Sequence, residues 1–116
     1  MKTVVFNIQT LDSALAGFAG AWKSGKGDVS AHIGFETWEL MHKVLSPKRL
    51  EIVRAMAGAG PLSMREVARR VGRDFKGVHS DATLLLETRV IDKDDQGKLL
   101  FPYDRIHVDF EIPAAA

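Results

Sequence analysis

The strongest constraint on the fold is a series of three helix-start signals in the middle of the chain. Ser46 precedes Pro47, and a proline at the first helical position loses only an amide hydrogen that would have no partner there. Ser63 and Glu66 have the spacing of a capping box, and Asp74 offers a third N-cap oxygen. The pattern predicts three consecutive helices joined by connections of a few residues.

Apolar residues at three- and four-residue spacing support each of these helices. Gly58, Gly60 and Pro61 are expected to end the first helix, and Gly72 the second. The expected inward faces are Leu50, Val53, Met56 and Ala57 in the first helix, Met64, Val67, Ala68 and Val71 in the second, and Phe75, Val78, Ala82, Leu85 and Leu86 in the third.

Beyond Val90 the period of the sequence changes from that of a helix to that of a strand. Residues 92–97 (DKDDQG) form a polar turn before Leu99 and Leu100, which predicts a hairpin. Residues 105–111 then alternate apolar and polar side chains, the pattern of a half-buried strand.

The chain before Ser46 is expected to contain a strand over residues 1–8 and an amphipathic helix from Leu11 to Trp22. Thr37 can cap a short helix through Leu45, whereas residues 25–34 give no clear prediction. An unpaired apolar strand invites association, so the first strand is expected to pair with the last, within one subunit or between two.

The order of helix, short helix, tight turn, longer helix and hairpin predicts an α+β fold of the winged helix-turn-helix type. Residues 1–45 are expected to form a strand-helix arm for dimerisation or partner binding. Residues 46–116 are expected to form the DNA-binding domain with a C-terminal strand.

Composition and charge narrow the function classes. The chain has 116 residues and no cysteine, which predicts one domain and excludes disulfide scaffolds and thiolate metal sites. The net charge is only +1, but it is unevenly distributed. Residues 46–90 hold nine basic and five acidic side chains, and residues 91–116 hold three basic and six acidic ones. A local basic surface can face phosphates even when the total charge is near zero.

The third helix is expected to enter the major groove of DNA, because this groove admits one α-helix. Lys76, Ser80 and Thr83 lie opposite Val78 on a helical projection, with His79 on the flank. The arginines of the second helix and the lysines of the hairpin are candidate phosphate contacts. The candidate DNA-contacting residues are Ser63, Arg65, Arg69, Arg70, Arg73, Lys76, His79, Ser80, Thr83, Lys93 and Lys98.

The candidate contacts with a second copy or a partner protein are apolar residues of the arm and the last strand. They are Val5, Phe6, Leu15, Phe18, Trp22, Val108 and Phe110.

No catalytic, metal or cofactor site is predicted. The four histidines have no metal-ligand spacing, and no phosphate-binding glycine loop or nucleophile motif is present. We expect a non-enzyme without a cofactor or a metal. Neither a signal peptide nor a membrane-spanning segment is recognised, so a cytoplasmic protein is expected.

Residues 45–90 and 101–108, with the blocks LSPKRLEI, REVARRVGRDFKGVH and PYDRI, resemble a family of short prokaryotic winged-helix proteins. These are MarR- or ArsR-like transcriptional regulators, some of them antitoxins of type II toxin-antitoxin pairs. The resemblance implies dimeric operator binding and, for antitoxins, capture of a toxin. The family often has a basic residue where this chain has Ser80, which shifts the expected phosphate contacts toward the second helix.

The main hypothesis is therefore a homodimeric, sequence-specific DNA-binding regulator that represses its own operon as an antitoxin. The alternative is a protein-interaction module that neutralises a toxin enzyme without reading DNA. RNA binding is a weaker alternative because no interleaved aromatic and basic platform is present. The arginines can also simply solvate a surface.

Overall fold

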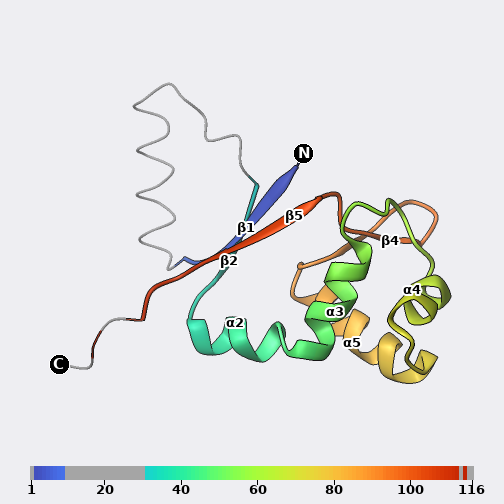
Figure 1. Cartoon of the computed structure of the whole chain (residues 1–116), viewed down its shortest axis with the longest axis horizontal. Coiled ribbons are helices and arrows are strands. Elements are labelled where there is room, and N and C mark those ends of the chain that lie inside the picture. Colours follow the sequence, from blue (N-terminus) through green and yellow to red (C-terminus); the bar gives the residue numbers. More distant parts are fainter. Residues whose placement is uncertain (1, 10–30, 113, 115–116) are drawn as a thin grey trace.

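The computed structural model describes residues 2–9, 31–112 and 114 (Figure 1). Within them the chain has an α+β fold. Its elements are β1 (Thr3–Ile8), β2 (Ala31–Phe35), α2 (Trp38–Val44), α3 (Pro47–Met56), α4 (Met64–Val71), α5 (Phe75–Glu87), β3 (Asp92–Lys93), β4 (Leu99–Leu100) and β5 (Arg105–Asp109).

The helices begin at the residues that the sequence predicts. The side-chain oxygens of Thr37, Ser46, Ser63 and Asp74 each accept a hydrogen bond from the backbone amide three residues further on. Gly72 ends α4 in the left-handed conformation, with φ of 68°, which a glycine adopts without steric cost. These predictions are confirmed.

The predicted inward faces are confirmed only in part. Helix α3 buries Ile52, Val53 and Met56, whereas Leu50 is only partly buried. Helix α5 buries Val78, Ala82 and Leu85, but Phe75 is 42% exposed. Phe75 is the first residue of α5, before the turn that contacts the core, so the prediction of a buried Phe75 is wrong.

The sheet is parallel, with β1 between its two neighbours in the order β2-β1-β5. In its register, Phe6 of β1 lies beside Ile33 of β2 and Val108 of β5. The pairing of the first strand with the last is confirmed and occurs within one chain. Strand β2 was not predicted. The predicted helix from Leu11 to Trp22, which carries Leu15, Phe18 and Trp22, lies outside the described residues.

The predicted hairpin is present as β3 and β4, which are antiparallel. At its turn, the carboxylate of Asp94 accepts hydrogen bonds from the backbone amides of Gln96 and Lys98 at 2.9 Å each. Leu62, in the connection before α4, exchanges two backbone hydrogen bonds with Leu99 of β4. This bridge fastens the hairpin to the start of α4.

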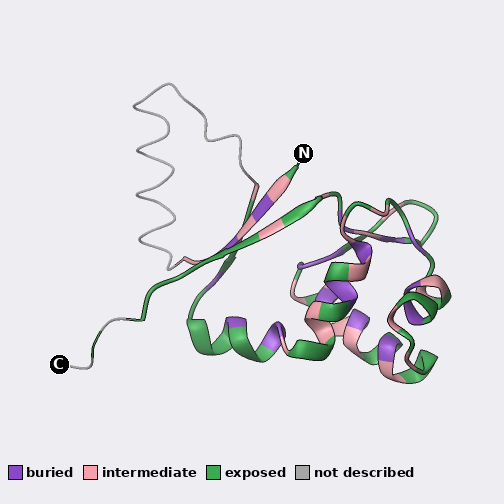
Figure 2. Cartoon of the chain, in the orientation of Figure 1, coloured by how far each residue is buried: buried purple, intermediate pink, exposed green. Residues whose placement is uncertain are grey.

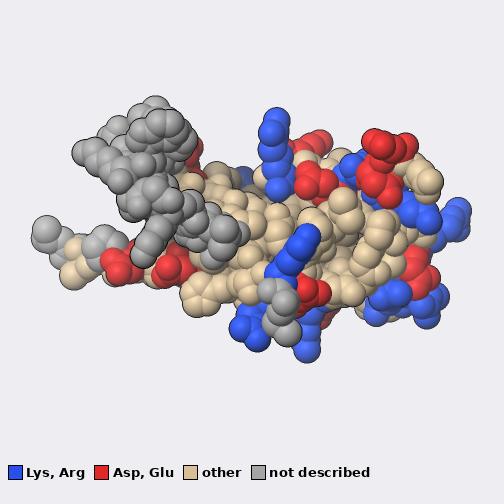
Figure 3. Space-filling model, turned by 90° about the horizontal axis from the view of Figure 1, so that it is seen from above, with Lys and Arg blue, Asp and Glu red and all other residues tan. Residues whose placement is uncertain are grey.

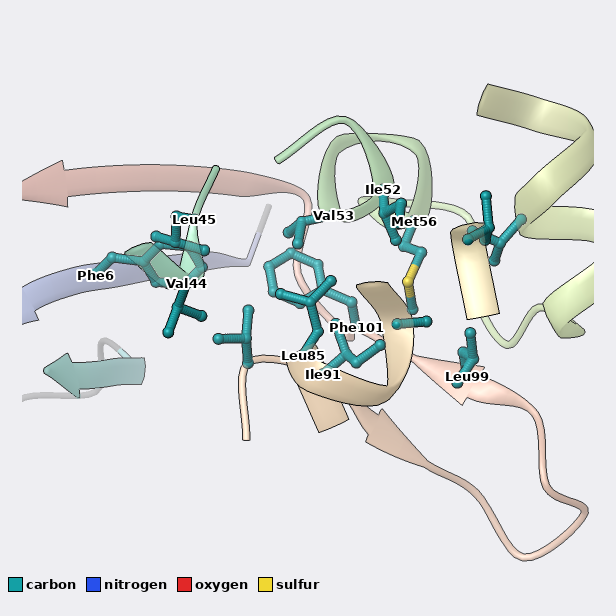
Figure 4. Packing of buried hydrophobic residues seen from close by; sticks show 14 of the residues in the cluster. Phe6, Val44, Leu45, Ile52, Val53, Met56, Leu85, Ile91, Leu99 and Phe101 are labelled. Carbon is teal, nitrogen blue, oxygen red and sulfur yellow. The ribbon is translucent and has the colours of Figure 1, made fainter. Parts of the chain in front are cut away.

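A single apolar core joins the sheet to the helices (Figure 2). Phe6 of β1 packs edge-on against Phe35 of β2 and against Phe101, with ring centroids 6.3 Å and 6.5 Å apart. Figure 4 shows Phe101 among Val53, Leu85 and other side chains of the core. Phe6 is fully buried, so its side chain is not available to a partner protein as the sequence had suggested.

Candidate nucleic-acid interface

The outer face of α5 presents most of the side chains that the sequence assigned to it. Lys76, His79 and Ser80 are exposed. Among the described residues, Lys76 forms no ion pair. Thr83 is half-buried, and its hydroxyl donates to the backbone carbonyl of His79 at 2.7 Å. The hydroxyl oxygen of Thr83 therefore remains an acceptor, while Lys76 is free to contact an anion.

Phe75 adds an apolar contact to this face that sequence reasoning missed. The guanidinium carbon of Arg65, from α4, lies 5.1 Å from the centroid of the Phe75 ring, within the range of a cation–π contact. The His79 ring centroid is 5.8 Å from the same ring. The sequence feature that could have indicated an exposed Phe75 is the N-cap at Asp74, which makes Phe75 the first helical residue.

Arg69 and Arg70 share the carboxylate of Glu66 on the surface of α4. The Nε atoms of Arg69 and Arg70 lie 2.9 Å and 3.0 Å from its oxygens. The hydrogen bonds from Arg69 and then from Arg70 lower the pKa of Glu66 to about 2, and the hydrogen bond with Glu66 raises the pKa of Arg69. Both arginines remain exposed, but a phosphate has to compete with Glu66 for them.

Arg73 has a different environment from the other arginines of this region. Asp81 of α5 accepts from Arg73 at 2.8 Å and from Arg49 of α3 at 3.1 Å. The Arg73 side chain is 20% exposed. Partial burial alone raises the pKa of Asp81, but the hydrogen bonds from Arg73 and Arg49 outweigh it and lower that pKa. Arg73, a predicted phosphate contact, is therefore paired with Asp81 of α5 and is not a free surface cation.

The remaining candidates lie at the edges of this surface. Ser63 is exposed, and its hydroxyl caps α4. Lys93 and Lys98 are exposed on the hairpin, together with Asp92 and Asp95. The hairpin therefore presents two cations next to two exposed carboxylates.

Figure 3 shows that many of the lysines and arginines visible from above gather over the end of the molecule that carries α4, α5 and the hairpin, with acidic side chains between them. This distribution agrees with the basic character of residues 46–90.

The candidate partner contacts among the described residues differ in their exposure. Val5 is half-buried and Phe6 is in the core. Val108 and Phe110 are 47% and 42% exposed. They line an apolar groove of about 360 Å³, together with Trp38, Met41, His42, Leu45, Leu50 and Ile112.

The described elements define an α+β protein that combines four helices with a parallel three-stranded sheet and a short antiparallel hairpin. The chain belongs to the HVO_A0114 family, whose family model matches residues 44–108. This range covers α3, α4, α5, the hairpin and most of β5. No curated protein and no solved structure gives a significant match.

The described residues contain no helix long and apolar enough to cross a bilayer. They also contain no group of three or more histidine, aspartate or glutamate side chains placed to hold a metal ion.

Proposed function

We propose that the chain is a dimeric DNA-binding regulator in which α3, α4, α5 and the β3–β4 hairpin act as a winged helix-turn-helix. In this proposal α5 enters the major groove, α4 crosses the backbone and the hairpin is the wing. The element order supports this assignment, as does the bridge between Leu62 and Leu99 that fastens the hairpin to the start of α4.

The single observation that carries the proposal is the outer face of α5. Lys76, His79 and Ser80 are exposed there beside Phe75 and Arg65. Lysine can bind a phosphate or a guanine edge, histidine and serine can bind base edges or phosphates, and an aromatic ring can contact the methyl group of thymine. This combination of two cations, hydrogen-bonding groups and one aromatic ring supports contact with a DNA groove over simple exposure to solvent.

The test is fluorescence anisotropy of the whole chain with duplex DNA from the region upstream of its own gene. Lys76→Ala is expected to weaken binding and to flatten the plot of log affinity against log salt by about one unit, because one phosphate contact is lost. Lys43→Ala is the matched control, since Lys43 is an exposed lysine on α2, at the other end of the molecule from α4. Equal affinity and slope for the two variants and the unmodified chain would overturn the proposal.

A more specific hypothesis is that this regulator is an autorepressing antitoxin, which also binds a toxin protein. It is tested by copurification with the product of the adjacent gene. Recovery of the chain without that product at every salt concentration would count against a toxin partner and would leave the DNA-binding proposal in place.

A further inference from the structure

Strand β5 is an edge strand of the parallel sheet. It pairs with β1 on one side, and no described residue pairs with its other side. Its five residues are exposed or half-buried. An exposed strand edge offers unpaired amide and carbonyl groups to another strand.

The direction of these free groups follows from one hydrogen bond. The amide of Arg105 donates to the carbonyl of Lys2 at 3.1 Å, toward the β1 side of β5. Because the amides and carbonyls of a strand alternate between its two sides, those of Ile106 and Val108 are directed toward the free edge. Two residues are therefore positioned to form backbone hydrogen bonds with a new strand.

The side chains of β5 have a self-complementary order. Arg105 and Asp109 are equidistant from His107, with Ile106 and Val108 between. If two copies of this strand pair in antiparallel orientation about His107, each Arg105 lies opposite Asp109 of the second copy. Each Ile106 then lies opposite Val108, and these pairs exchange the backbone hydrogen bonds of the free edge. Opposite charges placed across an antiparallel pair stabilise it, and a two-fold interface requires such reciprocity.

An apolar groove adjoins β5 through Val108. Ile106 and Val108 share one face of the strand because side chains alternate, and Phe110 and Ile112 follow Val108 at the same two-residue spacing. Val108, Phe110 and Ile112 are 47%, 42% and 61% exposed in one chain, and they border Trp38 of α2. Exposed apolar surface of this kind, continuous with an open strand edge, marks a protein interface.

We propose that β5 pairs antiparallel with β5 of a second copy of this chain, centred on His107, and joins the two sheets into one. The partner of β5 is a second copy of the chain because the order of charges along β5 is self-complementary. The inference gives a geometry to the dimer in the proposed function, but it rests on the sheet and not on α4 or α5, so that either can fail without the other.

The experiment measures the mass of the whole chain by light scattering after gel filtration, with circular dichroism to check folding. The unmodified chain is expected at twice its monomer mass of 12.8 kDa. Asp109→Arg places arginines opposite each other and is expected to give monomers, as is Arg105→Asp, which places aspartates opposite each other. The double variant carrying both substitutions restores opposite charges and is expected to dimerise again.

Two further measurements make the test specific. Asp95→Arg, at an exposed position of the hairpin turn, makes the same charge change away from β5 and is expected to remain dimeric. Hydrogen exchange is expected to protect the amides of Ile106 and Val108 in the dimer and not in the Asp109→Arg monomer.

Several outcomes would overturn the inference. These are a monomeric unmodified chain, a dimer that Asp109→Arg leaves intact, failure of the double variant to dimerise, or burial of the groove only by a different protein. A monomer that still binds DNA would reject this interface alone. A dimer that fails to bind DNA would reject the proposed function and keep the interface.

Discussion

At the scale of single residues, Asp81 determines the role of two basic side chains. It binds Arg49 from α3 and Arg73 from the connection before α5, and all three side chains are no more than one-fifth exposed. The Arg49 guanidinium also donates to the carbonyls of Lys43 and Val44 at 2.7 Å. Asp81 therefore connects helices α3 and α5, and the basic middle segment has fewer free cations than its sequence charge suggests.

Replacing Asp81 with Asn is expected to lower the free energy of unfolding at pH 7 by about 1–3 kcal/mol, because charge-assisted hydrogen bonds to two arginines are lost. The folded-state pKa of Asp81 is lowered from its ordinary value of 3.8. Its stabilising contribution is therefore complete well above pH 3.8 and is lost as pH falls through the lower folded value. The difference between the two proteins should shrink on acidification.

Urea unfolding between pH 7 and about pH 3 measures this difference. Asp95→Asn is the control, because Asp95 is exposed in the hairpin turn and such surface changes alter stability by less than about 0.5 kcal/mol. A difference between Asp81→Asn and the unmodified chain that stays constant over this range would contradict the role given to the carboxylate.

At the scale of elements, α4 has two arginines whose availability Glu66 controls. Because its pKa is lowered to about 2, Glu66 stays ionised near neutral pH, and a change of pH in that range does not release Arg69 and Arg70. Glu66→Gln keeps a residue suited to the third position of a capped helix. We expect it to tighten DNA binding and to steepen the salt dependence, because phosphates no longer compete with a carboxylate.

Anisotropy measured across a salt series distinguishes this effect from a general change in charge. Glu39→Gln removes one negative charge from the exposed surface of α2 and serves as the control. If the two variants bind DNA equally well, the pairing on α4 has no influence on DNA binding.

The elements differ in how far the sequence could predict them. Caps are local, so Ser46, Ser63 and Asp74 marked the helix starts correctly. Strand β2 was missed because its apolar alternation is short and follows a glycine-rich segment. The exposure of Phe75 and the pairing of Arg73 depend on how the elements are arranged, which the periodicity of the sequence does not predict. The free edge of β5 likewise follows from the order of strands in the sheet.

At the scale of the whole molecule, the parallel sheet and the helical unit share one core. Phe101, between the hairpin and β5, contacts Phe6 of β1 and Tyr103, with ring centroids 6.5 Å and 5.1 Å apart. It is 1% exposed. Any division of the chain near residue 45 therefore crosses a packed interface, and we expect the sheet and the helices to unfold together.

Phe101→Ala is expected to lower the free energy of unfolding by about 3–5 kcal/mol, because a buried aromatic ring is removed and a cavity remains. Phe101→Leu fills more of that cavity and should cost less. Urea unfolding is followed at one protein concentration by circular dichroism, which reports the helices, and by tryptophan fluorescence, to which Trp38 contributes from the groove that Val108 of β5 also lines. Coincident transitions in the unmodified chain, displaced together by Phe101→Ala, indicate one cooperative unit. Separate transitions, or a displacement of only one signal, would show that the sheet and the helices unfold independently.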